Sequence, residues 1–158
     1  MTRTPDDVQR ALDQLGLGIR VRRHGESTAT AQEAAAAAGS ELGAIVKSLC
    51  FEIDGQAVLI LTAGDKRVDE KKVGALAGVS RKKVRMADYE TTVSMTGYEP
   101  GGVPPLGLAR ELPVLIDASL ARYEVVHGAA GAADATFPIP FETLVSATGG
   151  RVADIARD

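Results

Sequence analysis

The sequence predicts an α+β fold, a single domain in which helices flank a mixed β-sheet. Segments of helical and strand character alternate along the 158 residues, and residues 44–64 form a clear β-hairpin around the turn Asp54-Gly55. No linker and no internal repeat divides the chain. We therefore expect residues 1–158 to form one domain, which is long enough to bury a core.

Capping residues predict the helices. The first helix begins at Thr4 and Pro5, because threonine is a favoured N-cap and proline is favoured at the first helical position. The second follows the capping box of Thr30 and Glu33, and its alanines continue until Gly39. Similar caps and apolar spacing predict further helices over 69–77, 88–95 and 141–147.

Short runs of apolar and β-branched residues predict the strands. These runs are 19–23, the two arms of the hairpin 44–64, 112–117, 123–127 and 136–139, and a short basic stretch, 81–85, is also expected to be a strand. Several of the runs lie between predicted helices, which is why we expect a mixed sheet rather than a purely antiparallel one.

A lysine interrupts the apolar face of the first hairpin strand. Strand side chains alternate between faces, so Lys47 shares its face with Ile45 and Leu49. Its stem could pack on apolar surface while the amine reaches water, or it could guard an exposed sheet edge against aggregation. Alternatively the amine projects into a cleft, where it holds an oxygen of a ligand or forms a Schiff base.

The segment 97–107, GYEPGGVPPLG, contains four glycines and three prolines in eleven positions. It is either a surface turn or a rigid loop whose bare backbone approaches a ligand. It is not a nucleotide P-loop, which requires a lysine followed by serine or threonine after the glycines.

Composition excludes several classes of function. The net charge of −3 gives no overall attraction to nucleic acid, so a nucleic-acid partner would need a local basic cluster such as 20–23 or 81–85. The single cysteine, Cys50, predicts a packed thiol, and His24 and His127 are expected to be ordinary surface or strand-end residues; together they provide no metal-ligand set. Without an apolar run that could cross a membrane, or a signal-peptide segment, we expect a soluble cytoplasmic protein.

Several motifs together resemble the YbaK/EbsC family, the free-standing relatives of the editing domain of bacterial prolyl-tRNA synthetases. The similarity runs from about residue 25 to the C-terminus. The residues that carry it are Ile45-Val46-Lys47-Ser48-Leu49, Thr62-Ala63-Gly64, Arg67-Val68-Asp69, Thr96-Gly97-Tyr98, Gly101-Gly102-Val103-Pro104-Pro105-Leu106-Gly107 and Leu115-Ile116-Asp117.

The resemblance implies a trans-acting hydrolase that removes a wrong amino acid from the 3′ end of a tRNA. The family's strand lysine falls on Lys47 and its substrate-gripping loop on Gly101 and Gly102, so these three are the expected catalytic residues. Backbone amides of the loop would stabilise the oxyanion. Lys47 would supply a fixed positive charge rather than act as a base, because no neighbour in the sequence clearly lowers its pKa. No cofactor and no metal is expected.

Four further positions are expected to bind substrate through the same resemblance, namely Thr28, Ser48, Val103 and Asp134. Thr30 is expected to serve as an N-cap rather than as a contact. Some relatives carry a histidine near Asp134, whose carboxylate here would either hold the substrate's ammonium group or cap a turn. The implied partners are mischarged tRNA and, as a supplement, an aminoacyl-tRNA synthetase.

Two other functions remain open at this point. One is a non-catalytic module of the same fold that binds tRNA or an aminoacyl-nucleotide ligand, and the other is a Schiff-base lysine enzyme. The sequence leaves the amino acid, the tRNA, the water-activating group and the oligomeric state undetermined.

Overall fold

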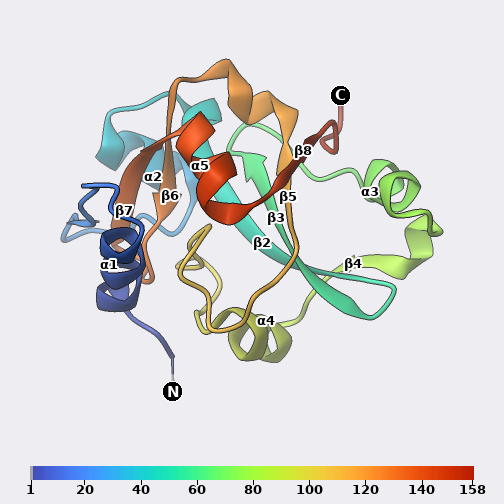
Figure 1. Cartoon of the computed structure of the whole chain (residues 1–158). Helices are drawn as coiled ribbons and strands as arrows, with labels where there is room; N and C mark the ends of the chain where they lie inside the picture. The colour runs from blue at the N-terminus through green and yellow to red at the C-terminus, as the bar shows by residue number, and fades with distance from the viewer. Residues whose placement is uncertain (1) are drawn as a thin grey trace.

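The computed structural model describes residues 2–158 and shows one mixed sheet with helices packed on its faces (Figure 1). The strand order is β1-β7-β6-β2-β3-β5-β8, and β4 pairs with β2 off this path. The strands are β1 (Arg22–Arg23), β2 (Ile45–Ile53), β3 (Gln56–Ala63), β4 (Val84–Met86), β5 (Val114–Asp117), β6 (Val125–Ala129), β7 (Ala135–Pro140) and β8 (Arg151–Ala153). The α-helices are α1 (Pro5–Gln14), α2 (Ala31–Ala38), α3 (Glu70–Ala77), α4 (Tyr89–Thr96) and α5 (Phe141–Thr148). The predicted α+β class with a mixed sheet is confirmed.

The hairpin of β2 and β3 forms the centre of the sheet. Its turn residues, Asp54 and Gly55, have φ angles of 50° and 82°, as a two-residue hairpin turn with positive φ at both positions requires. On its other edge, β2 pairs with β6 only at residues 45–46 and with β4 only at residues 51–53. Within the described residues 2–158, residues 47–49 of β2 therefore have no strand partner on that edge, and the sheet is open there.

The helix caps follow the sequence closely. Thr30 accepts a hydrogen bond from the Glu33 N–H at 3.1 Å, and the reciprocal half of the capping box is also present. Asp69 and Asp88 cap α3 and α4 through their side chains, which accept backbone N–H bonds of the first helical turn. Because the cap at Thr30 sets where α2 begins, it also places the residues just before α2 against the open part of β2.

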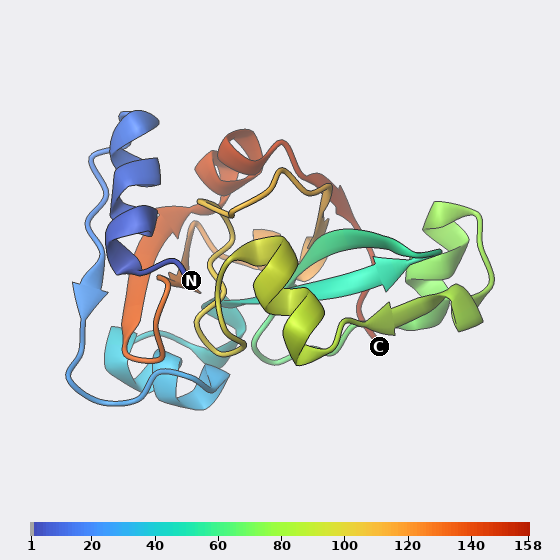
Figure 2. The same cartoon turned by 90° about the horizontal axis from the view of Figure 1, so that it is seen from below.

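The two faces of the sheet bury separate apolar clusters. Alternation along β3 directs Leu59 and Leu61 to one face and Ile60 to the other. The first face packs with α1 and α5, and the second packs with α3. Figure 2 shows the same arrangement from below, with α1 and α3 at opposite ends of the molecule.

Two predicted segments differ from the structure, and one strand was not predicted. Residues 81–83 form a 3-10 turn whose first N–H groups are capped by Ser80, so β4 begins only at Val84. The predicted strand 19–23 is reduced to two paired residues, at the sheet edge. Strand β8 was not predicted, because three residues that pair in parallel with the distant β5 leave no local pattern.

No helix within residues 2–158 is long and apolar enough to cross a membrane.

Candidate functional site

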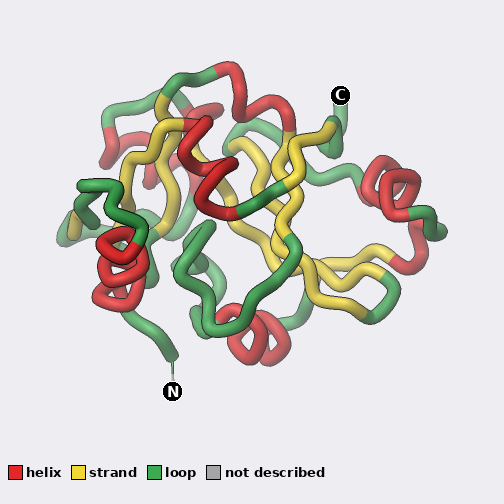
Figure 3. The backbone as a smooth tube through the Cα atoms, in the orientation of Figure 1, coloured by secondary structure: helices red, strands yellow, loops and turns green. Residues whose placement is uncertain are grey.

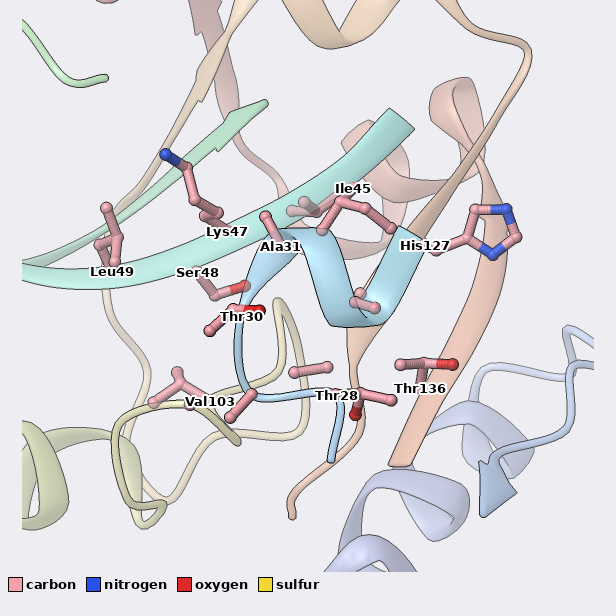
Figure 4. A pocket seen from close by; sticks show the side chains of 16 residues that line it. Thr28, Thr30, Ala31, Ile45, Lys47, Ser48, Leu49, Val103, His127 and Thr136 are labelled. Carbon is pink, nitrogen blue, oxygen red and sulfur yellow. The ribbon is translucent and has the colours of Figure 1, made fainter. Parts of the chain in front are cut away.

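A pocket of about 230 Å³ lies beside the open edge of β2 (Figure 4). Its walls come from the segment before α2, the start of α2, the loop 97–107, and strands β6 and β7. The lining residues are Thr28, Ala29, Thr30, Ala31, Ala34, Ile45, Val46, Lys47, Ser48, Leu49, Gly101, Val103, His127, Gly128, Ala129 and Thr136. The structure thus brings the predicted site residues Lys47, Ser48, Gly101, Val103 and Thr28 to one pocket, and their contact with substrate stays a prediction.

Lys47 is half-buried, and its amine is held by the turn that follows β3. The Nζ atom donates a hydrogen bond to the carbonyl oxygen of Lys66. Figure 4 shows the amine directed away from Thr28 and Thr136, toward the far end of the pocket. The charge on an apolar strand face is thus accommodated because the stem crosses the apolar wall and the ammonium group emerges beside the pocket.

The pKa of Lys47 is lowered, first by burial and then by the positive charge of Arg67, whereas Asp65 raises it. Asp65 is itself engaged by both guanidinium nitrogens of Arg122, at 2.7 and 3.0 Å. The expectation that no neighbour lowers this pKa was wrong, because Arg67 reaches the amine through the turn after β3 rather than through β2.

Ser48 lies on the opposite face of β2 from Lys47. Its Oγ atom is buried and, within residues 2–158, has no hydrogen-bond partner. The Cys50 carbonyl accepts a hydrogen bond from the Ala87 N–H at 2.9 Å, on the edge of β2 away from β3. Backbone groups two residues apart in a strand point to the same edge, so the N–H and carbonyl of Ser48 also point to the open edge. A buried hydroxyl without a partner is unusual in a folded protein, and this one lines the pocket.

The glycine loop is built on a type II turn. The Gly102 N–H donates to the Glu99 carbonyl at 3.0 Å, Pro100 occupies the second position, and Gly101 occupies the third with φ of 91°. Such a turn needs a residue that tolerates positive φ at its third position, which explains Gly101. Within residues 2–158, the N–H groups of Gly101 and Val103 have no hydrogen-bond partner.

Gly102 was predicted to be a catalytic residue of the loop, but the structure gives its backbone a structural role. Its N–H is used in the turn, and its carbonyl accepts from the Gly131 N–H at 2.9 Å. A Cβ at this position would lie 3.0 Å from the backbone nitrogen of Ala132. Gly102 does not line the pocket; it lets the loop dock closely on the connection between β6 and β7.

Asp134, predicted to bind substrate, does not line the pocket. Its carboxylate pairs with Arg23 at 2.9 Å, and its backbone carbonyl accepts from the His24 N–H at 2.8 Å. The ion pair uses the oxygens that would have held a substrate ammonium group. Within residues 2–158 the carboxylate also accepts no backbone N–H, so the alternative role as a turn cap is not seen either.

His127 and Thr136 line the pocket although the sequence did not place them there. His127 is half-buried, and its pKa is lowered by burial and by the nearby charge of Arg22. Thr136 is 3% exposed. Ala129 is paired with Thr136 across β6 and β7, and His127 lies two residues before Ala129. Because strand side chains alternate between faces, His127 and Thr136 point to the same face of the sheet. The sequence alone gives the alternation but not the pairing.

Cys50 is buried, and burial raises the pKa of its thiol, which is consistent with the packed thiol that was predicted. No group of three histidine, cysteine, aspartate or glutamate side chains within residues 2–158 is arranged to hold a metal ion. The expectation of a reaction without metal or cofactor stays a prediction.

Comparison with known proteins agrees with the resemblance seen in the motifs. The family profile described as "Aminoacyl-tRNA editing domain" matches residues 25–147. The chain is 36% identical over 134 residues to the uncharacterized protein YwhH of Bacillus subtilis, covering 84% of this chain and 83% of YwhH. It is 37% identical over 109 residues to a proline–tRNA ligase of Bacillus licheniformis; these cover 69% of this chain but only 18% of the ligase.

A solved structure described as "a putative trans-editing enzyme for prolyl tRNA synthetase" superposes with a TM-score of 0.91, at 38% identity, and covers all of this chain and 99% of that one. The fold is that of the editing-domain structures. The chain belongs to the aminoacyl-tRNA editing domain family.

Proposed function

We propose that this protein hydrolyses the ester bond of mischarged aminoacyl-tRNA and acts in trans, as a free-standing deacylase. The observation that carries the proposal is the convergence of a lysine, an unpartnered buried serine hydroxyl and a glycine loop around one small pocket. Membership of the aminoacyl-tRNA editing domain family supports it.

An aminoacyl ester is already activated, so the protein mainly has to position it and stabilise the oxyanion that forms when water attacks. The N–H groups of Gly101 and Val103 are the proposed donors, because both residues line the pocket and neither N–H is used within the described chain. One such donor is worth about 10²–10³ in rate. Gly102 keeps a supporting role, through the turn that presents its neighbours.

Lys47 is proposed to hold the terminal nucleotide through its charge. Its amine already has one acceptor, the Lys66 carbonyl, and retains two further N–H donors. The neighbouring guanidinium of Arg67 adds positive charge at the same end of the pocket, where a phosphate or ester oxygen would be favoured. Ser48 and Thr28 are proposed to line the space for the aminoacyl group.

The proposed partner is mischarged tRNA. Recruitment by an aminoacyl-tRNA synthetase is a further proposal, supported by the match to one segment of a proline–tRNA ligase. We assign no side chain as the general base, and activation of water by the substrate's own hydroxyl or amine is compatible with the pocket.

The test is a panel of tRNAs, beginning with tRNA(Pro), each charged with a range of wrong amino acids and incubated with the protein. We expect at least one ester to be hydrolysed well above its spontaneous rate, and the rate to fall in Lys47→Ala. Binding of tRNA without hydrolysis of any ester would instead establish the non-catalytic alternative. Borohydride-dependent trapping of a carbonyl compound on Lys47 would establish the Schiff-base alternative.

A further inference from the structure

The glycine loop 97–107 is closed at its neck by the N-terminal segment of the chain. The backbone N–H of Arg3 donates to the Gly97 carbonyl at 2.7 Å, and its guanidinium Nη1 donates to the Gly107 carbonyl at 3.3 Å. The Gly107 carbonyl also accepts from the hydroxyl of the buried Tyr98 at 2.7 Å. Arg3 therefore holds both ends of the loop, one through its backbone and the other through its side chain.

Close packing accompanies these hydrogen bonds. Gly97 has φ of 88°, and a Cβ at this position would lie 3.1 Å from the Cδ atom of Arg3. A Cβ at Gly107 would lie 3.2 Å from that of Ala11, so α1 rests directly on this glycine. Glycine at both ends of the loop thus allows the N-terminal segment to approach the loop backbone. Figures 1 and 2 both show this segment beside the loop.

The same N-terminal segment also supports the surface on which the loop docks. The Gly102 carbonyl accepts from the Gly131 N–H at 2.9 Å, and a Cβ at Gly131 would lie 2.9 Å from the backbone nitrogen of Pro5. Val8 and Leu12 of α1 are fully buried in the core, which anchors the helix itself. The start of α1 is therefore a fixed support that contacts the neck of the loop and the connection between β6 and β7.

The loop needs such a support because it carries the proposed oxyanion donors. Residues 97–107 form no helix or strand, yet the N–H groups of Gly101 and Val103 stabilise an oxyanion only if they are fixed before the reaction. A misplacement of about 1 Å can cost ~100-fold in rate. Arg3 itself does not line the pocket, so any effect that it has on the reaction must pass through the loop.

We infer that Arg3 is a positioning residue of the deacylase, which locks the neck of the loop and so fixes the amide donors of Gly101 and Val103. Arg3 precedes the segment 25–147 that the family profile matches, so the family assignment gives it no role. At neutral pH both side-chain donors to the Gly107 carbonyl are available, because a guanidinium keeps its protons and burial raises the pKa of Tyr98 to about 12. This inference rests on the proposed deacylase function.

The test compares Arg3→Leu, which keeps an apolar stem on Gly97 but removes the guanidinium, with Arg3→Lys, which restores a cationic donor. On the mischarged tRNA that is hydrolysed fastest, we expect Arg3→Leu to lower kcat about tenfold with little change in KM, because the amide donors act in the transition state. Arg3→Lys should recover most of the loss. Arg10→Leu is the matched control: it removes an exposed arginine of α1 that is paired with Asp7, and it should keep the wild-type kcat.

Motion of the loop tests the lock without relying on turnover. ¹⁵N relaxation dispersion should show new microsecond-to-millisecond motion of Gly101 and Val103 in Arg3→Leu, and neither in Arg3→Lys nor in Arg10→Leu. If Arg3→Leu is too unstable to measure, Arg3→Gln gives the same comparison, because its side chain is two bonds shorter and too short for the Gly107 carbonyl.

A purely structural role of Arg3 would give different results. A lower melting temperature of Arg3→Leu with unchanged kcat would show that Arg3 only stabilises the fold, and a loss of kcat without new motion of the loop would show that it acts by another route. Either result overturns the inference while leaving the deacylase intact. If the wild-type protein hydrolyses no mischarged tRNA in the wider panel, the proposed function fails and the catalytic part of this inference fails with it, whereas the motion of the loop in Arg3→Leu still decides whether Arg3 holds it.

Discussion

Burial and the positive charge of Arg67 both disfavour the charged form of Lys47. The negative charge of Asp65 and the hydrogen bond to the Lys66 carbonyl favour it. A lysine kept at such a position contributes little to stability, because its hydrogen bond is offset by desolvation and by repulsion. The charge is better explained by an anionic or carbonyl oxygen of a ligand that completes the set of partners.

We expect Lys47→Ala to lower the rate of deacylation by at least about tenfold, the equivalent of ~1.4 kcal/mol in transition-state stabilisation. The melting temperature should stay close to that of the wild-type protein, because the amine holds only one turn carbonyl. Single-turnover rates on mischarged tRNA and thermal melts measure the two effects. Lys71→Ala, an exposed lysine on α3, is the control. Near wild-type turnover in a folded Lys47→Ala would remove this residue from the mechanism.

The lowered pKa of Lys47 predicts a titration that can be observed directly. A base with a lowered pKa loses its proton at a lower pH than usual, so the Lys47 amine should titrate below the ~10.4 of an ordinary lysine. NMR of ¹³Cε-labelled lysine measures the midpoint. Arg67→Gln removes a repelling charge and should raise the midpoint, whereas Asp65→Asn removes an attracting charge and should lower it. A midpoint that does not respond to Arg67→Gln would show that the two groups are not coupled.

At the scale of elements, the loop 97–107 and the open segment of β2 form the site together. The loop is tied to the sheet at two points, through Gly102 against Ala132 and through Pro105 against Gly128. Close approach at both points requires glycine, because a Cβ at Gly102 or Gly128 would lie about 3.0 Å from its neighbour. We therefore expect Gly102→Val to lower stability, since the loop would have to move to admit the side chain.

Gly101 provides the sharper test of the loop. Ala at Gly101 has space, with its Cβ 3.4 Å from that of Ala29, but it is strained by the φ of 91°. Gly78→Ala is a matched control, because Gly78 has φ of 73° with nothing nearby and caps α3 away from the pocket. Both variants should lose stability by roughly 1–2 kcal/mol. Only Gly101→Ala should also lose deacylation, by as much as ~100-fold where the amide donors shift by about 1 Å.

The comparison between these two glycine variants separates strain from function. Equal rates in Gly101→Ala and Gly78→Ala, at equal stability, would show that the loop is only a turn. A selective loss of rate in Gly101→Ala would support its place against the ester.

At the scale of the whole molecule, the two basic clusters considered for tRNA binding lie far apart. Arg20, Arg22 and Arg23 lie at the β1 edge, whereas residues 81–85 lie at the opposite end, between α3 and β4 (Figure 3). In the second cluster, the positive charge of Arg85 is already paired with the carboxylate of Glu52. The β1 cluster is the one near the pocket, where Arg22 influences His127.

We therefore expect Arg22→Gln to weaken binding of tRNA and to reduce the slope of log K against log salt by about one. Lys82→Gln, which removes an exposed charge at the other end, should change neither quantity. Binding titrations at several salt concentrations provide the measurement. A larger effect of Lys82→Gln than of Arg22→Gln would place the tRNA on the opposite end of the molecule.

Local signals in the sequence were sufficient for the class of fold and for much of the site. Caps at Thr30, Asp69 and Asp88, together with the turn at Asp54-Gly55, act over a few residues, so they could be recognised without tertiary information. The motifs around Lys47 and Gly101 likewise marked the two segments that meet at the pocket. Segments such as β8 escaped prediction because their pairing partner is distant in the chain.

The helices, the central hairpin, and the segments that carry the lysine and the glycine loop could therefore be predicted from the sequence. Only the tertiary structure decided the use of each group in the site. It engaged Asp134 with Arg23, and it brought His127 and Thr136 to the pocket wall. The physical reason is that hydrogen bonds and ion pairs between segments more than a hundred residues apart, as between Arg23 and Asp134, depend on how the sheet is assembled, and no local pattern records it.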